Sequence, residues 1–472
     1  MTMTIRGLTE QDVLALSAAG DEPDWLRDRR QEAFKAFADL AWPDSRVEEW
    51  RYTDPSRFDL DRPIADASGS GPDIAGSITA AVGDGVAARA RVADGRFAGV
   101  DAQSDDRVTV TDLASAARGE HAGLVHAHLG GVVGADEKFA ALSLAAFIGG
   151  ALVVVPDETE VDRPIVVTVQ AVRDGACLPR VLVVVGRNAK AAVYVDHAGD
   201  AAQTLVEVVE VVVGEGATAH VVSAQDWGPK VDHLGVHTGL VHPNGDYRHL
   251  EVSLGGGTVY IRPDVRLDHP GGNAQLLGVY FCDEGQQIEH RSLIHHNASH
   301  TTSELVYKGA LQGDSRATFF GNIRISPHAK ATSSDQTNRN LILTDKARAD
   351  SIPFLEIENS DVVRCGHHSS VGQVDEIQLF YLESRGIPRE EAARLLVFGF
   401  FAEVTDRIDL PGVTQTVLAE VEREIRSGPT ALMDQRRGSG GGPPDRGSGG
   451  GPPQRRGSVP QRGPWGGPPR RR

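Results

Sequence analysis

Between about Leu142 and Val371 the chain is built from short valine-rich segments that follow one another closely. Roughly 15 such segments can be distinguished in this region. The first of them are Ala151–Pro156, Ile165–Ala171, Val181–Val185, Ala191–Val195, Thr204–Val213 and Thr218–Ala224. Turn-forming residues separate the segments, including Gly186, Gly199–Asp200, Gly214–Gly216 and Gly228–Pro229. No long helical pattern interrupts the series, so this region is predicted to be almost entirely β-structure.

Several segments alternate apolar and polar residues, as Glu304–Lys308 does, which is typical of strands with one buried face. A single β-sandwich uses about seven to nine strands, too few for this series. Propeller blades would repeat at roughly 40 to 50 residues with a visible motif, and the sequence shows none. A parallel β-helix stacks its coils around one continuous core and needs no strict repeat. The pattern therefore favours a mainly β fold with a parallel β-helix core.

Helical patterns flank this region on both sides. Apolar residues recur at helical spacing between residues 10 and 50, until Pro43 ends the run. After Val371 the helical period returns, with Pro388 at the start of one helix and an amphipathic segment at Val413–Ile425. We therefore divide the chain into an N-terminal helical or mixed domain (1–135), a β-helix core (136–372), a C-terminal helical domain (373–428) and a tail (429–472).

The tail differs from the rest of the chain in composition and in charge. Residues 436–472 contain nine Arg and one Asp and therefore carry a net charge of +8. The whole chain carries −17, so residues 1–435 carry −25. An Arg/Gly/Pro-rich segment cannot offset its ordering entropy by burial, and we predict that it is disordered. An acidic body argues against general nucleic-acid binding.

The sequence lacks the motifs of several enzyme classes, namely GxxxxGK[ST], GxGxxG, HExxH and GxSxG. It therefore offers no phosphate cradle, zincin helix or nucleophile elbow. The missing motifs argue against a self-contained NTPase, dehydrogenase or hydrolase.

Three widely spaced cysteines exclude a disulfide framework and suit a reducing cytosol. Met1–Glu10 has no secretory pattern, and Ala140–Pro156 is shorter than the ~20 residues that span a bilayer. We expect a soluble, cytoplasmic protein with no membrane span.

Cys365 and His367 are the candidate metal-binding residues. In a strand, residues two apart project to the same face, so these two side chains would lie together while His368 points to the other side. A thiolate and an imidazole form a plausible soft site for iron or zinc. The alternative is that Cys365 packs as a small apolar residue and His367 forms a hydrogen bond at a coil corner.

The other histidines and cysteines are expected to be structural. His290 and His296 would share one strand face with Ser292 and Ile294. Polar ladders of this kind are commonly solvated or hydrogen-bonded to the neighbouring coil. Cys177 and Cys282 lie in apolar segments, and we expect both thiols to be buried and inert.

Several segments together resemble the SufB/SufD family of iron–sulfur cluster assembly proteins. They are Val47–Thr53 (VEEWRYT), Lys138–Leu142 (KFAAL), Cys365–Gln373 (CGHHSSVGQ) and Leu379–Ile387 (LFYLESRGI). The resemblance covers about residues 30–426 and is closer to the SufD branch. SufB-type chains have Glu-His-Glu where this chain has Gly366-His367-His368, and a scaffold cysteine where it has Asn338.

The resemblance implies a right-handed parallel β-helix flanked by helical domains. It implies pairing with SufB through the β-helix core, and binding of the ATPase SufC through the C-terminal helices, with a homodimer left open. His367 would correspond to the family's interface histidine and Cys365 to the neighbouring SufD cysteine. Both would bind an iron–sulfur cluster that is transient and shared with SufB, while nucleotide is bound by SufC and not by this chain.

Two other functions remain open at this point. Asp264, Arg266, Asp335 and Arg339 could line the groove of a β-helix enzyme that acts on acidic polysaccharide. The acidic body and the expected cytosolic location argue against an anionic polymer as substrate. The Arg/Gly tail could instead make the chain an RNA-associated adaptor, although Trp465 is its one aromatic residue.

Overall fold

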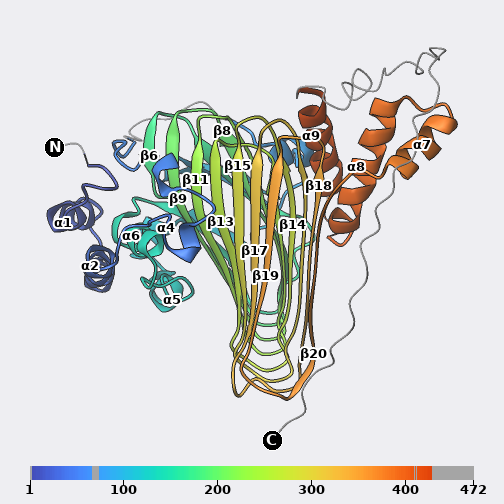
Figure 1. Cartoon of the computed structure of the whole chain (residues 1–472). Helices are drawn as coiled ribbons and strands as arrows, with labels where there is room; N and C mark the ends of the chain where they lie inside the picture. Colours follow the sequence, from blue (N-terminus) through green and yellow to red (C-terminus); the bar gives the residue numbers. More distant parts are fainter. Residues whose placement is uncertain (1–2, 66–73, 409, 411, 428–472) are drawn as a thin grey trace, which may run out of the picture. The chain divides into compact units, whose positions relative to one another are not determined.

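The computed structural model describes residues 3–65, 74–408, 410 and 412–427. Most of its strands wind into a parallel β-solenoid of about eight turns, with helices at both ends of the chain (Figure 1). This confirms the predicted mainly β fold and its parallel β-helix core. The handedness of the coil remains an expectation. The predicted disordered tail, 429–472, lies outside the described residues.

The strands are β1 Ala88–Ala93, β2 Arg96–Gln103, β3 Thr109–Asp112, β4 Gly150–Val155, β5 Ile165–Ala171, β6 Gly175–Cys177, β7 Arg180–Val185, β8 Lys190–Gly199, β9 Gln203–Val213, β10 Thr218–Trp227, β11 Asp232–Val241, β12 Asp246–Ser253, β13 Thr258–Leu267, β14 Asn273–Cys282, β15 Gln287–His296, β16 Thr302–Leu311, β17 Arg316–Ile325, β18 Thr332–Ile342, β19 Arg348–Ile357 and β20 Val362–Gln373. The helices are α1 Glu10–Ala19, α2 Asp24–Asp39, α3 Ser77–Val82, α4 Leu113–Ala116, α5 Ala122–His128, α6 Lys138–Ala146, α7 Glu376–Ser384, α8 Arg389–Thr405 and α9 Val413–Ser427, with the 3₁₀ turns η1 Glu48–Trp50 and η2 Pro55–Arg57.

Each turn of the solenoid contributes one strand to each of two facing sheets. The sheet that ends at β20 runs β2-β1-β5-β8-β10-β12-β14-β16-β18-β20, and the sheet that ends at β19 runs β19-β17-β15-β13-β11-β9-β7-β4-β3. We call them the β20 sheet and the β19 sheet. From β4 onward every pairing is parallel, and paired residues are between 26 and 32 positions apart in the chain. This variable spacing is why the sequence shows no strict repeat.

The corners between strands need residues that tolerate a left-handed backbone. Asn188, Gly216, Asn244 and Gly271 have φ values of 53°, 65°, 58° and 77°. They belong to successive turns, which are joined by backbone hydrogen bonds such as Gly216 N to Pro243 O at 2.9 Å. Glycine and asparagine adopt this conformation at little cost, so the Gly/Asn corners of the sequence mark real turns.

Three apolar cores explain why so many strands are valine-rich along their whole length. The lumen, the space enclosed by the two sheets, is filled by inward-facing residues such as Val183, Val211 and Ile294. The outer face of the β19 sheet is covered by N-terminal helices, with α6 packed against β9. The outer face of the β20 sheet is covered by α8 and α9 (Figure 1). Strands with both faces buried lose the alternating pattern.

Aromatic stacking and hydrogen bonds fix the two helical regions to the sheets. Trp50, in the VEEWRYT segment, stacks on Tyr260 of β13 with ring centroids 4.4 Å apart. Thr53 Oγ1 donates to Glu289 Oε2 at 2.6 Å in a buried contact. On the other side, Lys308 Nζ donates to the backbone oxygen of Phe400 at 2.9 Å, which holds α8 against β16.

The buried histidine His296 generates a prediction about pH and stability. Its Nδ1 is 2.7 Å from Thr301 Oγ1 and its Nε2 is 2.9 Å from Ser303 Oγ. Burial lowers the pKa of His296 to about 4, whereas the unfolded chain has about 6.5. The unfolded state therefore binds more protons between these values, and stability falls as the pH falls through this window. The contribution of this group is at most about 3 kcal/mol.

The measurement is urea unfolding of the wild-type chain and of His296→Gln at about pH 7.5 and about pH 4.5. Glutamine keeps two polar atoms and removes the titration, so the variant is expected to lose less stability on acidification. An equal loss in both chains would contradict a neutral, buried imidazole at this position.

Candidate functional site

Cys365 and His367 lie on β20, the last strand of the solenoid. Within the described residues β20 pairs on one side alone, with β18. No further turn of the described chain covers it, so the outward backbone groups of β19 and β20 form the open end of the solenoid. Most β20 side chains are partly or fully exposed. The candidate residues therefore lie at a sheet edge, where another chain can add strands.

The pairing register gives the direction of both side chains. Cys365 is paired with Ser334, and His367 is paired with Gln336. Ser334 and Gln336 are 1% and 0% exposed. Paired residues of a sheet project to the same face, so Cys365 and His367 both face the open end of the lumen. Cys365 also packs against the lumen core.

His368 points to the other face of the strand. Its Nε2 is 4.0 Å from Asp335 Oδ1 on the outer side of the solenoid. Asp335 also pairs with Arg364, 3.1 Å away. His368 is therefore separated from Cys365 and His367 by the backbone, although it is next to His367 in the sequence.

The lumen beneath this end is polar. Asn338 Nδ2 donates to the backbone oxygen of Tyr307 at 3.2 Å, and Asn340 Nδ2 donates to Asn338 Oδ1 at 2.8 Å. Tyr280 hydroxyl donates to Asn340 as well. Asn338 is paired with Ser369 on β20, and Gln336, two residues earlier on the same strand, is paired with His367.

The electrostatics keep the Cys365 thiol protonated. Partial burial raises the pKa of Cys365 above its ordinary value, and the nearby charge of Asp335 raises it further. A metal ion binds the thiolate and displaces this proton. In the absence of a metal, Cys365 is therefore a poor nucleophile at neutral pH.

Two ligands do not complete a metal site. Among the described residues, two sets of three or more His, Cys, Asp or Glu side chains are close enough to hold one ion, and neither set contains Cys365 or His367. An iron–sulfur cluster uses roughly four protein ligands. Cys365 and His367 alone are therefore too few to complete such a ligand set.

The edge also exposes apolar side chains. Phe354 and Ile357 on β19 are 47% and 44% exposed, and Val363 and Val371 on β20 are 72% and 46% exposed. Val363 is the extra residue of a β-bulge, because the register with β18 shifts between Thr332 and Ser333. Apolar side chains on an unpaired edge are typical of a surface that another protein covers.

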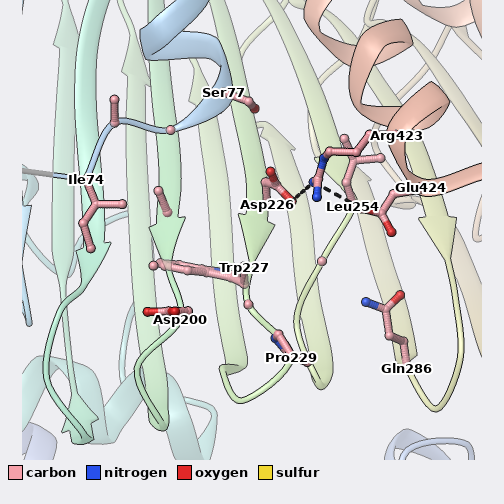
Figure 2. Close-up of a pocket in the computed structure, with 16 residues that line it drawn as sticks. Ile74, Ser77, Asp200, Asp226, Trp227, Pro229, Leu254, Gln286, Arg423 and Glu424 are labelled. Carbon is pink, nitrogen blue, oxygen red and sulfur yellow. Dashed lines mark hydrogen bonds and ion pairs between the residues drawn. The ribbon is translucent and has the colours of Figure 1, made fainter. Parts of the chain in front are cut away.

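A separate pocket of about 520 Å³ lies between the β20 sheet and α9, and Figure 2 shows its lining. Its charged residues include Asp226 and Arg423, which form an ion pair of 2.7 Å, and Glu424. Burial raises the pKa of Glu424 to about 7. Among the described residues no His or Cys lines this pocket, and these residues therefore offer none of the soft ligands that iron–sulfur chemistry needs.

Comparisons with known proteins agree with the geometry. Residues 167–400 match the family model "SUF system FeS cluster assembly, SufBD core domain". An iron–sulfur cluster assembly SufBD family protein of Mycobacterium leprae is 39% identical over 297 residues, which cover 61% of this chain and 75% of the relative. The chain belongs to the SufBD family.

Similarity to a SufD extends over most of the chain. The iron–sulfur cluster assembly protein SufD of Bacillus subtilis is 28% identical over 452 residues, which cover 90% of this chain and 100% of that protein. A SufBD family protein of Staphylococcus epidermidis is 28% identical over 435 residues. These findings confirm the family predicted from the sequence motifs and support a role in iron–sulfur cluster assembly. No described helix is long and apolar enough to cross a membrane.

The structure separates the residues of the polysaccharide alternative. Asp264 and Arg266 lie on β13 of the β19 sheet, whereas Asp335 and Arg339 lie on β18 of the β20 sheet. Arg339 is 3.9 Å from Glu403 of α8. The four side chains therefore do not form one groove.

The remaining histidine and cysteine predictions can be compared with the structure directly. His290 Nε2 is 3.0 Å from Ser253 Oγ, a bond to a neighbouring turn. Cys177 and Cys282 are buried, as expected. Sequence reasoning missed a set of buried histidines that includes His233 and His237. The signal was available, because these two flank Gly235 at a spacing of two on each side and therefore share one strand face.

The three cysteines generate a prediction about thiol reactivity. Cys365 is partly exposed, whereas burial raises the pKa of Cys282 to about 12 and raises that of Cys177 as well. Iodoacetamide should therefore modify Cys365 of the folded chain at least about tenfold faster than either other thiol. Its rate should rise with pH beyond pH 9, because the thiolate is the reactive form.

Peptide mass spectrometry after timed quenching measures the three rates. The chain unfolded in guanidinium serves as the control, in which all three thiols should react alike. Modification of Cys282 in the folded chain as fast as that of Cys365 would contradict the described packing.

Proposed function

We propose that this chain is a SufD-like, non-enzymatic subunit of the SUF machinery that acts in the cytoplasm. It pairs with SufB through the open end of the solenoid and binds the ATPase SufC through α7–α9. Cys365 and His367 hold a transient iron–sulfur cluster together with ligands of SufB. The observation that carries this proposal is the position of both residues on an edge strand that pairs on one side alone among the described residues, with an incomplete ligand set.

The edge of β20 suits a protein partner because its outward backbone N–H and C=O groups can form hydrogen bonds with a further strand. A strand that pairs on one side leaves alternate N–H and C=O groups free to bond a further strand. β20 is 12 residues long, so a partner strand can add a continuous ladder. The exposed Val363 and Val371 would then be covered by that partner. A second copy of this chain could dock in the same way, which makes a homodimer the competing assembly.

The chemistry of the two residues suits a cluster that is handed on. Cysteine thiolates are the ordinary ligands of iron–sulfur clusters, and histidine nitrogen can replace them. A site divided between two chains opens when the chains move apart, whereas a site closed within one chain does not. Asn338 provides no thiolate in the lumen, so this chain depends on SufB for the remaining ligands.

The C-terminal helices offer a second docking surface. Ile377, Phe380 and Tyr381 on α7 are 77%, 70% and 56% exposed. Leu379, on the opposite side of the same helix, is buried at 1% exposure. Apolar residues that remain exposed on one helix face suit a protein partner. We assign this partner to SufC, whose ATP hydrolysis would drive rearrangement at the SufB interface.

The test is cluster formation in the complex of this chain with SufB and SufC. His367→Ala should lower the iron and sulfide retained by the purified complex by about tenfold, because it removes a direct ligand. Iron and sulfide are quantified after anaerobic co-purification. Partner binding should persist, because one exposed side chain contributes little to a 12-residue edge.

His368→Ala is the matched control, because it removes the neighbouring imidazole from the opposite face of β20. Its cluster content should equal that of the wild-type complex. Equal cluster content in His367→Ala would remove this residue from the mechanism. Failure of the wild-type chain to bind either SufB or SufC would overturn the proposed function itself.

A further inference from the structure

Four histidines and two glutamates meet in the lumen several turns away from β20. They come from both sheets, are each at most 1% exposed, and are His197 on β8, Glu207 on β9, His233 and His237 on β11, and His249 and Glu251 on β12. We call this group the lumen cluster. Both sets of potential metal ligands in the described part of the chain lie in it.

The carboxylate of Glu207 is the centre of the first set. Its Oε2 is 2.8 Å from His197 Nε2, 3.2 Å from His233 Nε2 and 3.1 Å from His237 Nε2. One ring nitrogen each of His197 and His233 and one carboxylate oxygen of Glu207 lie within 4.8 Å of one another. Two imidazoles and one carboxylate are the ligand set of non-haem iron sites.

The second set lies directly beside the first. Glu251 Oε2 is 3.2 Å from both His237 Nδ1 and His249 Nε2. Ser223 Oγ donates to the other oxygen of this carboxylate at 3.1 Å. His237 therefore bridges the two carboxylates, and the second set orients the imidazole that faces the first.

One oxygen in the cluster has no partner. Among the described residues none forms a hydrogen bond with Glu207 Oε1, although this atom is fully buried. A buried, unpaired carboxylate oxygen is costly, and native proteins retain one where a ligand or ion completes it.

A glycine lets other side chains approach this carboxylate closely. Gly235 is paired with Glu207 in the adjacent turn. A Cβ at Gly235 would lie 2.6 Å from Ile261 Cδ1, 3.1 Å from His237 Nε2 and 3.3 Å from His233 Nε2. The missing side chain therefore allows the two imidazoles to lie on either side of this position.

Outer hydrogen bonds set the tautomers. His197 Nδ1 is 2.9 Å from the backbone oxygen of Ala224, which can accept only. His197 therefore carries a proton on Nδ1 that it donates to Ala224. In the neutral imidazole this leaves the Nε2 lone pair directed at Glu207, as in metal-bound histidines. His233 Nδ1 currently accepts from Trp227 Nε1 at 3.2 Å, and Gln225 Oε1 lies 3.5 Å away. To bind an ion through Nε2, His233 must carry its proton on Nδ1 and donate it to Gln225 Oε1, and Trp227 Nε1 then loses His233 as its acceptor.

We propose that the lumen cluster binds one divalent first-row transition-metal ion of the Fe²⁺ class, through Glu207, His197 and His233. Imidazole and carboxylate ligands suit Fe²⁺, Mn²⁺ and Zn²⁺ and offer no thiolate. Because every ligand is buried, the ion enters while the chain folds. The site is separate from Cys365 and His367, and the proposal does not rest on the proposed function.

The competing arrangement is an ion-free network. Two carboxylates and four neutral imidazoles carry −2, which either one divalent ion or two protonated imidazoles can balance. His197 faces two acceptors and His237 lies between two carboxylates, so these two would hold the protons. The two arrangements differ in metal content, which can be measured directly.

The experiment produces the full chain in minimal medium with Fe²⁺, Zn²⁺ or Co²⁺ as the added metal. Each sample is purified anaerobically, dialysed against a chelator and analysed for metal by mass spectrometry. The background is the double variant Cys365→Ala/His367→Ala, so that the open end contributes no metal. We expect about one ion per chain with at least one of the three metals.

Glu207→Gln removes the central charge at nearly constant volume and should lower the retained metal by about tenfold. His296→Gln is the matched control, since it replaces another buried lumen histidine that bonds hydroxyl groups, and it should retain the ion. In the Co²⁺ sample, visible d–d bands without thiolate charge-transfer bands would identify nitrogen and oxygen ligands.

The metal content of the chain with an intact lumen cluster distinguishes the metal site from the ion-free network even if Glu207→Gln fails to fold. Trace metal in all three wild-type samples would overturn the proposal and establish the protonated network. A thiolate signature, or metal that Glu207→Gln retains in full, would also overturn it. A filled lumen site in a chain that fails to bind SufB or SufC would leave this inference standing while the proposed function fell.

Discussion

Parallel pairing of each strand with the corresponding strand of the next turn is the constraint on which the rest of the structure depends. The side-chain period of a strand is two, so a slip of one residue would turn every lumen side chain outward. The register observed from β4 to β20 keeps valines and polar residues such as Glu207 and Gln336 inside. The same ladder also determines where the solenoid ends, because a strand without a successor has an unpaired edge.

The outer faces and the open end of the solenoid have different roles because of this ladder. Helices cover the outer faces of both sheets and bury apolar residues there. No described element covers the edge of β19 and β20, where Cys365 and His367 face the open end of the lumen. Stability is therefore supplied along the length of the coil, whereas the residues available for shared chemistry lie at its end.

The mainly β fold could be predicted from the valine-rich segments and their Gly/Asn corners, because both follow directly from local backbone physics. The shared face of Cys365 and His367 followed from strand periodicity alone. The lumen cluster could not be assembled in this way, because His197 lies on β8 and Glu207 on β9, which belong to the two facing sheets and are not paired with each other. Sequence spacing does not reveal which coil lies beneath which. The exposed face of α7 was equally hidden, because a periodic apolar face predicts a helix whether or not a partner covers it.

The account's central claim is that β20 is an incomplete edge that SufB completes around Cys365 and His367. Hydrogen exchange of the backbone amides of β20, measured with and without SufB, tests this most directly. The outward amides of β20 should exchange quickly in the isolated chain and slowly in the complex, because a partner strand bonds them. The amides of β2, at the opposite edge of the same sheet, should not change. Unchanged exchange along β20 in a complex that contains SufB would contradict the claim.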